Sequence, residues 1–289
     1  MMSQILEATQ TFILSNARLL ERQLFAFHFQ QGNPDRVRAA LLAYQNADGG
    51  FGNALEPDKR TSSSQPIDQE IALRVLDDIG FDTGIALQIC DFLETITTVE
   101  GGVPFVLPTV RDAPRAEWWN TDLDEPPASI NPTASIAGLL HKYEIRHPWL
   151  NRATDYCWQY IEHLQISSGH DFLCVQLFLE YVADRERAEH AFERMSTQLM
   201  AGGHITYDPS ASGYVFMPLA YAPSPKNMSR RLFDTTTIQK HLAALASQQQ
   251  MDGGWPISWP AVSPVCELEY RGIVTLNTLK TLKAYDYIE

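Results

Sequence analysis

A glutamine–glycine–aromatic phrase recurs along the chain, and it constrains the fold more than any other feature of the sequence. The phrase reads Gln45-Asn-Ala-Asp-Gly-Gly-Phe51 near the start and Gln249-Gln-Met-Asp-Gly-Gly-Trp255 near the end. Weaker copies lie at 165–169 and 198–203, and a fifth at 97–102 keeps the two glycines without the glutamine. Recurrence of one phrase indicates a repeat architecture, in which each unit buries its apolar face against the next.

The segment before each copy carries apolar residues at three- and four-residue spacing, as in Ile238, Leu242 and Leu245 ahead of Gln249, which is typical of amphipathic helices. Glycine just past such a segment ends a helix, and Asn-Pro at 33–34 and 131–132 begins one. No segment alternates with a period of two, so we expect an all-α fold without a sheet. The pattern predicts ten helices in five pairs, at about 5–30, 34–46, 66–79, 84–97, 132–144, 149–165, 171–183, 185–201, 234–250 and 267–285.

The composition of the chain limits the kinds of molecule that the protein could bind. Hydrophobic residues make up 45% of the 289 positions, which is enough for a substantial core. A formal charge of −13 without a basic run excludes nucleic acid and anionic membrane surfaces as main partners. The amino terminus lacks signal-peptide features, and the most apolar stretch, 172–183, is too short to span a bilayer. The four cysteines form no CxxC pair, so we expect a cytoplasmic protein without stable membrane insertion, disulfides or a thiolate zinc site.

The repeated phrase resembles the QW repeat of squalene and oxidosqualene cyclases, and its Gly-Gly-Phe-Gly form resembles the repeat of protein prenyltransferase β subunits. The resemblance covers the repeat ends along the whole chain. It implies a single-domain (α/α) toroid of five to six helix pairs over residues 1–289. It also implies structural roles for four residues: Gln45 and Gln249 would join neighbouring helices, and Phe51 and Trp255 would stack on that contact.

The chain departs from both families in its chemistry. It is long enough for one toroid, whereas squalene cyclases carry two. No Asp-x-Cys precedes a helix of the expected inner set, and Cys266 has no evident His partner, which disfavours a zinc-dependent prenyltransferase. The Asp-x-Asp-Asp acid motif of the cyclases has only a near match in Asp122-Leu-Asp124-Glu125. Since neither a paired-histidine motif nor a phosphate-binding glycine loop occurs, we expect no metal and no other cofactor.

Long connections at about 50–65, 102–131, 203–233 and 254–266 would share one face of such a ring. Connections of more than about 12 to 15 residues in a compact domain are usually functional, so this face is where we expect the binding site. Glu267 and Arg271 have the spacing of an i, i+4 ion pair on the last helix. The side chains on or beside the long loops that we expect to bind substrate are Glu56, Asp58, Trp118, Trp119, Tyr214, Trp259, Glu269 and Arg271.

Two acidic pairs compete for the role of proton donor. Asp122 and Asp124, with Glu125, precede prolines that favour extended backbone, which places both aspartates on one side. Glu56 and Asp58 have the same spacing, but Lys59 and Arg60 follow them, and neighbouring cations favour a charged carboxylate. We therefore predict Asp124, Asp122 and Glu125 as the catalytic group, and Glu56 with Asp58 as a polar clamp.

The leading functional hypothesis is a class II-like terpenoid cyclase that acts on a small hydrophobic isoprenoid. An acid would start a carbocation, and aromatic faces would stabilise it. A carbohydrate-active α/α-barrel hydrolase or lyase is an alternative, because aromatic rings beside a carboxylate pair also suit sugars. A non-catalytic prenyltransferase-like binding module is another. A homo-oligomer is compatible with each of these hypotheses.

Overall fold

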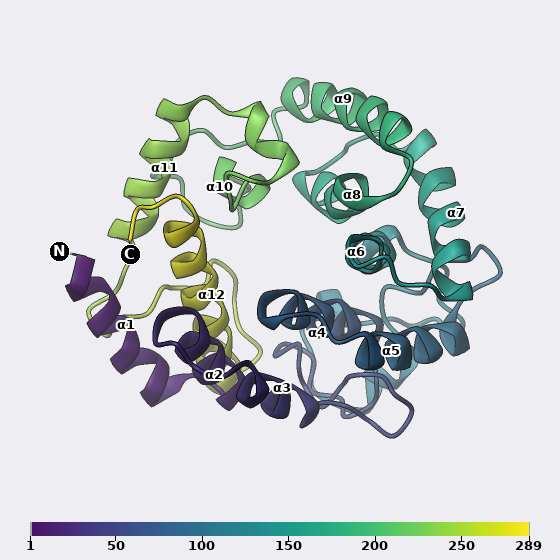
Figure 1. Ribbon diagram of the computed structural model, residues 1–289, viewed down its shortest axis with the longest axis horizontal. Helices are drawn as coiled ribbons and strands as arrows, with labels where there is room; N and C mark the ends of the chain where they lie inside the picture. The colour runs from purple at the N-terminus through teal and green to yellow at the C-terminus, as the bar shows by residue number, and fades with distance from the viewer. Residues whose placement is uncertain (1, 289) are drawn as a thin grey trace. The chain divides into compact units, whose positions relative to one another are not determined.

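The protein was analysed as a computed structural model that describes residues 2–288, with side chains from residue 5 onward. Within that range the chain is all-helical and contains no strand, which confirms the predicted all-α class (Figure 1). None of the described helices is long and apolar enough to cross a membrane. The helices are α1 (Met2–Asn16), α2 (Leu19–Phe29), α3 (Pro34–Leu42), α4 (Pro66–Ile79), α5 (Thr83–Ile96), α6 (Ile130–Lys142), α7 (Pro148–His163), α8 (Gly169–Tyr181), α9 (Arg185–Ala201), α10 (Pro218–Tyr221), α11 (Thr235–Ser247) and α12 (Pro264–Ala284).

The chain divides into two compact units. The middle unit spans residues 41–202, and the terminal unit combines the residues up to 40 with those from 203 onward. In the middle unit α4, α6 and α8 lie side by side, and α5, α7 and α9 cover them as a second layer (Figure 1). In the terminal unit α12 packs against α1, α2 and α11.

Helix α6 is the centre of the middle unit, and its residues from Pro132 to Leu140 are all buried. It approaches α8 very closely at Gly138, where an added Cβ would lie 2.5 Å from the backbone oxygen of Leu177. A side chain there would force the two helices apart. This contact therefore requires glycine, and it fixes the spacing of the inner layer.

The predicted single helix over 5–30 is wrong, because the chain breaks between α1 and α2. Arg18 is extended, with ψ at 165°, and its guanidinium forms two hydrogen bonds of 2.6 and 2.9 Å with the carboxylate of Glu21 in the first turn of α2. Ala17 at the break lies against Gly272 of α12, where an added Cβ would come within 2.9 Å. Tertiary contacts thus set a boundary at residues that favour helix on their own.

Three copies of the repeated phrase form turns of one construction. The residue after the glutamine position donates its N–H to the carbonyl of the second glycine, at 2.8 to 2.9 Å, in Asn46–Gly50, Thr98–Gly102 and Gln250–Gly254. The residue after the second glycine then donates its N–H to a side chain of the helix that follows the turn, which is α4, α6 or α12. The pairs are Phe51–Gln69, Val103–Thr133 and Trp255–Thr275. The copy at 97–102, weak in sequence, is therefore fully formed in structure.

The first glycine of each turn lies close to the backbone of a second helix, which is α5, α7 or α1. Its φ lies between 83° and 95°, a region in which residues with a Cβ are strained. An added Cβ would lie 2.9, 2.9 and 2.1 Å from a backbone oxygen of α5, α7 and α1, in the pairs Gly49–Gln88, Gly101–Arg152 and Gly253–Ala8. The three turns thus tie α4 to α5, α6 to α7 and α12 to α1.

The other two weak copies have different structures. Gly169 begins α8 instead of ending a helix, and Ser168 caps it. Gln198 lies inside α9, where its side-chain oxygen accepts a hydrogen bond of 2.9 Å from the N–H of Ile166. The prediction that the phrase ends a helix is therefore wrong at Gly169, whereas Gly202 and Gly203 do follow the end of α9.

Candidate functional site

The loop between α3 and α4 carries two buried carboxyl side chains. Glu56 is 5% exposed and Asp58 is 0% exposed, which is rare for acidic residues. The Glu56 carboxylate accepts a hydrogen bond of 3.1 Å from the N–H of Asp58, and the N–H of Glu56 donates at 2.9 Å to Asp68 at the start of α4. The acidic pair is thus held inside the middle unit by its own loop and by α4.

Lys59 follows the acidic pair and is fully buried as well. Its ammonium donates a hydrogen bond of 2.5 Å to the other carboxylate oxygen of Asp68, whose side chain is also fully buried. Buried charges are stable only when they are paired and hydrogen-bonded. Lys59 therefore forms its ion pair with α4, although its place in the sequence suggested that it would act on Glu56 and Asp58.

The long connection between α5 and α6 lies against this acidic loop. The N–H of Ala116 donates to the carbonyl of Asp58 at 2.8 Å, and the N–H of Arg60 donates to that of Pro114 at 3.0 Å. Gln65 adds a side-chain link to Thr109 at 2.8 Å. Because the two loops share backbone hydrogen bonds, the acidic pair and the residues around 114–119 form one structural element.

An aromatic stack stands next to that junction. The N–H of Trp119 donates to Ala116, and its ring lies face to face with Phe105 at 4.7 Å between centroids and 14° between planes. The indole N–H is buried and has no hydrogen-bond partner among the described residues. The sequence indicated Trp119 but not Phe105, since a lone phenylalanine in a loop gives no signal.

The predicted catalytic group lies in water. The Asp124 side chain is 89% exposed and forms an ion pair of 2.7 Å with Arg111. Asp122 and Glu125 are exposed as well, and Asp122 accepts a hydrogen bond of 3.3 Å from Asn120. Trp118 is 45% exposed, so it shares the surface with these acids while Trp119 is buried.

The net negative charge of the chain belongs to the middle unit. Residues 41–202 contain 25 Asp and Glu against 11 Lys and Arg, a formal charge of −14. The terminal unit contains 10 acidic and 11 basic residues, a formal charge of +1, which together give the −13 of the chain. The buried acids therefore stand in a strongly negative part of the molecule.

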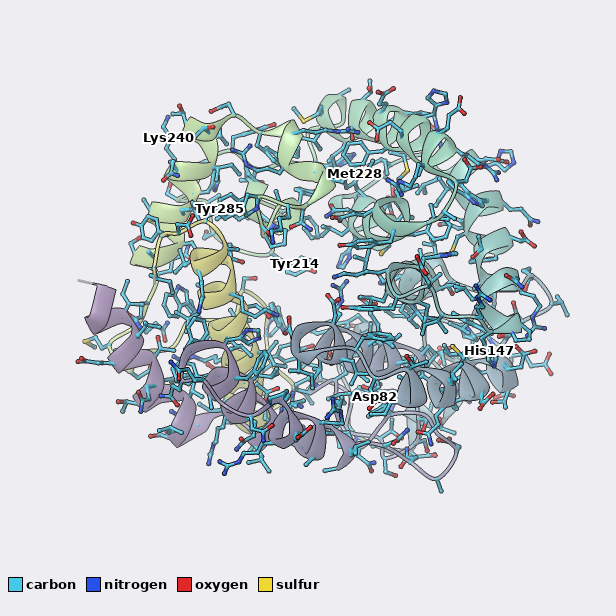
Figure 2. All side chains as sticks on the ribbon, in the orientation of Figure 1. Asp82, His147, Tyr214, Met228, Lys240 and Tyr285 are labelled. Atoms are coloured by element: carbon cyan, nitrogen blue, oxygen red, sulfur yellow. The ribbon has the colours of Figure 1, made fainter. Side chains whose placement is uncertain are left out.

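Aromatic residues from the other long connections meet in the terminal unit. Tyr214, labelled in Figure 2, contacts Trp259 edge to face with 6.2 Å between centroids, and Trp259 contacts Tyr270 in the same way at 5.0 Å. Tyr214 is 58% exposed, whereas Trp259, Glu269 and Tyr270 are half-buried. The structure thus brings the predicted residues Tyr214 and Trp259 together, with Glu269 beside them in sequence.

Arg271 belongs to the last repeat turn. Its guanidinium donates to Asp252 at 2.8 Å and to the carbonyl of Trp255 at 3.2 Å, and it lies 4.6 Å from the centre of the Phe12 ring. The i, i+4 pair with Glu267 suggested by the spacing is therefore wrong, because the turn brings a nearer carboxylate. These contacts give Arg271 a structural role in the turn.

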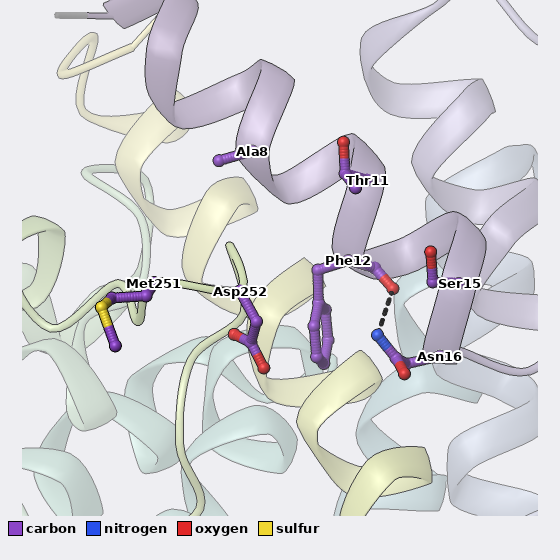
Figure 3. Close-up of a pocket in the computed structure, with 7 residues that line it drawn as sticks. All are labelled: Ala8, Thr11, Phe12, Ser15, Asn16, Met251 and Asp252. Carbon is purple, nitrogen blue, oxygen red and sulfur yellow. Dashed lines mark hydrogen bonds between the residues drawn. The ribbon is translucent and has the colours of Figure 1, made fainter.

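A pocket of about 460 Å³ lies beside the same turn (Figure 3). Its wall on α1 is mostly polar, and Asn16 there donates a hydrogen bond of 3.1 Å to the carbonyl of Phe12. The lining residues are Ala8, Thr11, Phe12, Ser15, Asn16, Met251 and Asp252. None of them belongs to the acidic loop or to the aromatic group, so this pocket is separate from both.

In the part of the chain that the structure describes, no three His, Cys, Asp or Glu side chains are grouped as a metal ion requires. No model of a known protein family matches the sequence, and no curated protein matches it either. Two parts of the molecule therefore remain as candidate sites: the acidic loop with its aromatic stack, and the aromatic group of the terminal unit.

Proposed function

We propose that the protein is an (α/α) toroid that transforms an isoprenoid by acid-initiated carbocation chemistry, with Glu56 and Asp58 as the acid pair. The observation that carries this proposal is the burial of both carboxyl groups on one loop. A proton donor must keep its proton near neutral pH, and burial favours the neutral form of a carboxyl group. The charge of the surrounding unit acts in the same direction.

Asp124 has a different setting. Its side chain is exposed and forms an ion pair of 2.7 Å with the guanidinium of Arg111, so it lacks the enclosure from water that a reacting carbocation requires. Of the two cations that weighed against Glu56 and Asp58, Lys59 is bound to Asp68, and Arg60 donates a hydrogen bond of 3.3 Å to the carbonyl of Pro57. The two acidic pairs therefore exchange roles in this proposal, and the group at 122–125 becomes a surface feature.

Aromatic rings supply the second requirement of the reaction. The Phe105–Trp119 stack is joined to the acidic loop through Ala116, and ring faces attract a developing cation. The buried indole N–H of Trp119 offers a hydrogen bond to an acceptor oxygen on the substrate. An isoprenoid that carries one oxygen-containing group fits this combination.

The toroid is the architectural part of the proposal. Three turns of one construction each tie an inner helix to an outer helix, and the last of them rests on α1, the first helix of the chain. Repeats that link neighbours in this way close readily into a ring. Small-angle scattering tests this inference, since an open arc of helix pairs has a larger radius of gyration than a ring.

A carbohydrate-active enzyme is the second candidate, and the exposed face of Tyr214 favours it. Tyr214 is exposed and contacts Trp259 edge to face, and sugars stack on exposed aromatic rings. A pyranoside that binds to the wild-type protein but not to a Tyr214→Ala variant would favour this candidate.

The test of the proposed acid compares Asp58→Asn and Glu56→Gln with Asp124→Asn. Each variant is first checked for folding by circular dichroism and thermal melting. Product formation is then assayed with 2,3-oxidosqualene and with geranylgeranyl diphosphate. Loss of a general acid typically lowers turnover roughly 10²- to 10⁴-fold, so we expect that loss for the buried pair and no loss for Asp124→Asn.

The reverse result would identify the surface group at 122–125 as the acid. In that result Asp124→Asn abolishes turnover, whereas Asp58→Asn and Glu56→Gln fold and retain it. Isoprenoid binding without turnover in any folded protein, including the wild type, would instead favour the non-catalytic binding module.

A further inference from the structure

Four aromatic rings of the terminal unit contact one another in series at steep angles. The planes of Phe216 and Tyr214 meet at 74°, with 5.4 Å between the ring centroids. Those of Tyr214 and Trp259 meet at 88°, and those of Trp259 and Tyr270 meet at 90°. The aromatic group of the terminal unit therefore consists of these four rings, which come from two long connections and from α12.

Rings in this arrangement form corners of a definite shape. Where the edge of one ring meets the face of another, the two faces enclose a right angle, so that a group seated in the angle contacts both faces at once. The face of an aromatic ring carries negative potential, whereas its edge is positive. Trp259 forms such corners with Tyr214 and with Tyr270. The aromatic group therefore presents corners in which both walls are negative.

The aromatic group can be reached from water. The Tyr214 side chain, labelled in Figure 2, is 58% exposed, and Trp259 and Tyr270 are half-buried. The next residue in the chain, Arg271, does not bring its charge to these rings, because its guanidinium is bound to Asp252 and to the carbonyl of Trp255. The open side of the corners thus faces solvent.

The wall that carries Tyr214 is anchored from behind. The N–H of Thr206 donates a hydrogen bond of 2.8 Å to the carbonyl of Phe216 and closes the loop between them. The Phe216 ring contacts fully buried Tyr221 at 6.2 Å between centroids, and the Tyr221 hydroxyl donates to the carbonyl of His204 at 3.0 Å. A ring held in this way loses little freedom when a ligand binds, which favours affinity.

We propose that the aromatic group is a binding site for an organic ammonium ion, and that a trimethylammonium group is the chemistry that it takes. Such a group is compact and rounded, and it is attracted to the face of each ring that lies within about 6 Å. It can therefore use two perpendicular faces together. A pyranose stacks its flat side on a single parallel ring, so a perpendicular neighbour adds little to its binding.

Titration calorimetry of the full-length protein with choline tests the proposal. The matched probe is 3,3-dimethyl-1-butanol, which has the shape of choline with a neutral carbon in place of the charged nitrogen. Sodium chloride keeps the ionic strength constant, because a chain with a formal charge of −13 attracts cations in general. We expect choline to bind, and the neutral probe to bind roughly tenfold more weakly or not at all.

Two sources of the trimethylammonium group can be distinguished in the same way. A peptide that carries trimethyllysine is compared with its unmethylated form and with choline. Tighter binding of the methylated peptide than of choline would support the site with a modified protein as its partner. Tighter binding of choline would support it with a free small cation as its ligand.

Variants locate the site. Trp259→Leu and Tyr214→Leu remove a ring face and keep an apolar side chain, so each should weaken choline binding by about three- to thirtyfold. Tyr214→Phe keeps the ring face and should bind within about twofold of the wild type. The control is Tyr160→Leu on α7, which removes a 40% exposed tyrosine of the middle unit and should change nothing. The Tyr214 variants suffice if Trp259→Leu does not fold, because Tyr214 is largely exposed.

Three results would overturn the proposal. One is a failure of choline to bind at millimolar concentration, and another is equal affinity for choline and for 3,3-dimethyl-1-butanol. The third is choline binding that is unchanged in Tyr214→Leu. A methyl pyranoside that binds where choline does not would favour the carbohydrate candidate instead. Because binding is measured directly, none of these results depends on turnover at the acidic loop.

Discussion

The side-chain amide of Gln249 donates a hydrogen bond of 3.1 Å to the backbone carbonyl of Ile5, 244 positions earlier in the chain. The same amide donates to Thr9 and to Gly253, and the Thr9 hydroxyl donates to Gly253 in turn. Gln45 uses its amide in a similar way in the first turn, with Gln88 and Gly49 as acceptors. The last turn thus contacts α1, the first helix of the chain, as the first turn contacts α5.

Gly253→Ala should be far more destabilising than Gly203→Ala. Both glycines have positive φ, which costs a residue with a Cβ about 1 to 2 kcal/mol. Only at Gly253 does the added Cβ meet backbone, 2.1 Å from the Ala8 oxygen, whereas nothing lies within 4 Å at Gly203. Overpacking adds about 1 to 3 kcal/mol. Urea denaturation measures the difference, and equal losses would contradict the close contact with α1.

Trp255→Ala should destabilise the terminal unit by about 3 to 5 kcal/mol, the usual cost of removing a packed aromatic ring. Trp255 is fully buried, and its indole N–H donates to the Leu245 carbonyl at 2.7 Å. The control is Trp118→Ala, a surface change expected to stay within about 0.5 kcal/mol. Thermal melting compares the two variants. An unchanged melting temperature for Trp255→Ala would argue against a packing role for the repeat aromatic.

Local signals predicted the helix ends well. Both α4 and α9 begin and end where the sequence placed them, because Pro66 and the Asp184 cap act within one turn. The break between α1 and α2 could not be predicted, since it depends on the contact of Ala17 with Gly272 and on the Arg18–Glu21 pair. Propensity alone favours an unbroken helix there.

The sequence located the acidic residues but could not predict their surroundings. Charge partners were judged by proximity in the sequence, which joined Lys59 to Asp58 and left Asp124 without a cation. Folding instead joins Lys59 to Asp68, nine positions away, and Arg111 to Asp124, thirteen positions away. Such pairings depend on how two loops lie together, and no local pattern encodes them.

The cysteine thiols should be unreactive in the folded protein. All four are buried and free, and burial raises the pKa of Cys90 and of Cys174 to about 12, so the reactive thiolate is scarce at pH 8. We expect no alkylation by iodoacetamide until denaturant is added, and then four alkylated thiols by mass spectrometry. Rapid labelling of a native thiol would show that the surrounding helices open readily.

His141 should make the middle unit sensitive to acid. Burial lowers its pKa, and its Nε2 atom meets the Thr154 hydroxyl at 2.8 Å. A histidine with a lowered folded-state pKa favours the folded state above the unfolded value near 6.5 and loses that contribution as the pH falls below it. His141→Gln should therefore flatten the fall in unfolding free energy between pH 7 and 5, whereas exposed His163→Gln should not. If the unfolding free energy fell equally steeply with pH in the two variants, His141 would not be the cause of the acid sensitivity.

The Lys59–Asp68 pair should show strong coupling in a double-mutant cycle. Removing one partner leaves the other charge buried and alone, which typically costs about 3 to 5 kcal/mol. We therefore expect Lys59→Met and Asp68→Asn each to lower the unfolding free energy by that amount. The double variant should lose much less than the sum, because it leaves no unpaired charge. The surface pair Arg111–Asp124 is the control, with an expected coupling of about 0.2 to 1 kcal/mol. Additive losses at Lys59 and Asp68 would mean that water reaches the acidic loop, and the condition for a buried proton donor at Glu56 and Asp58 would then be lost.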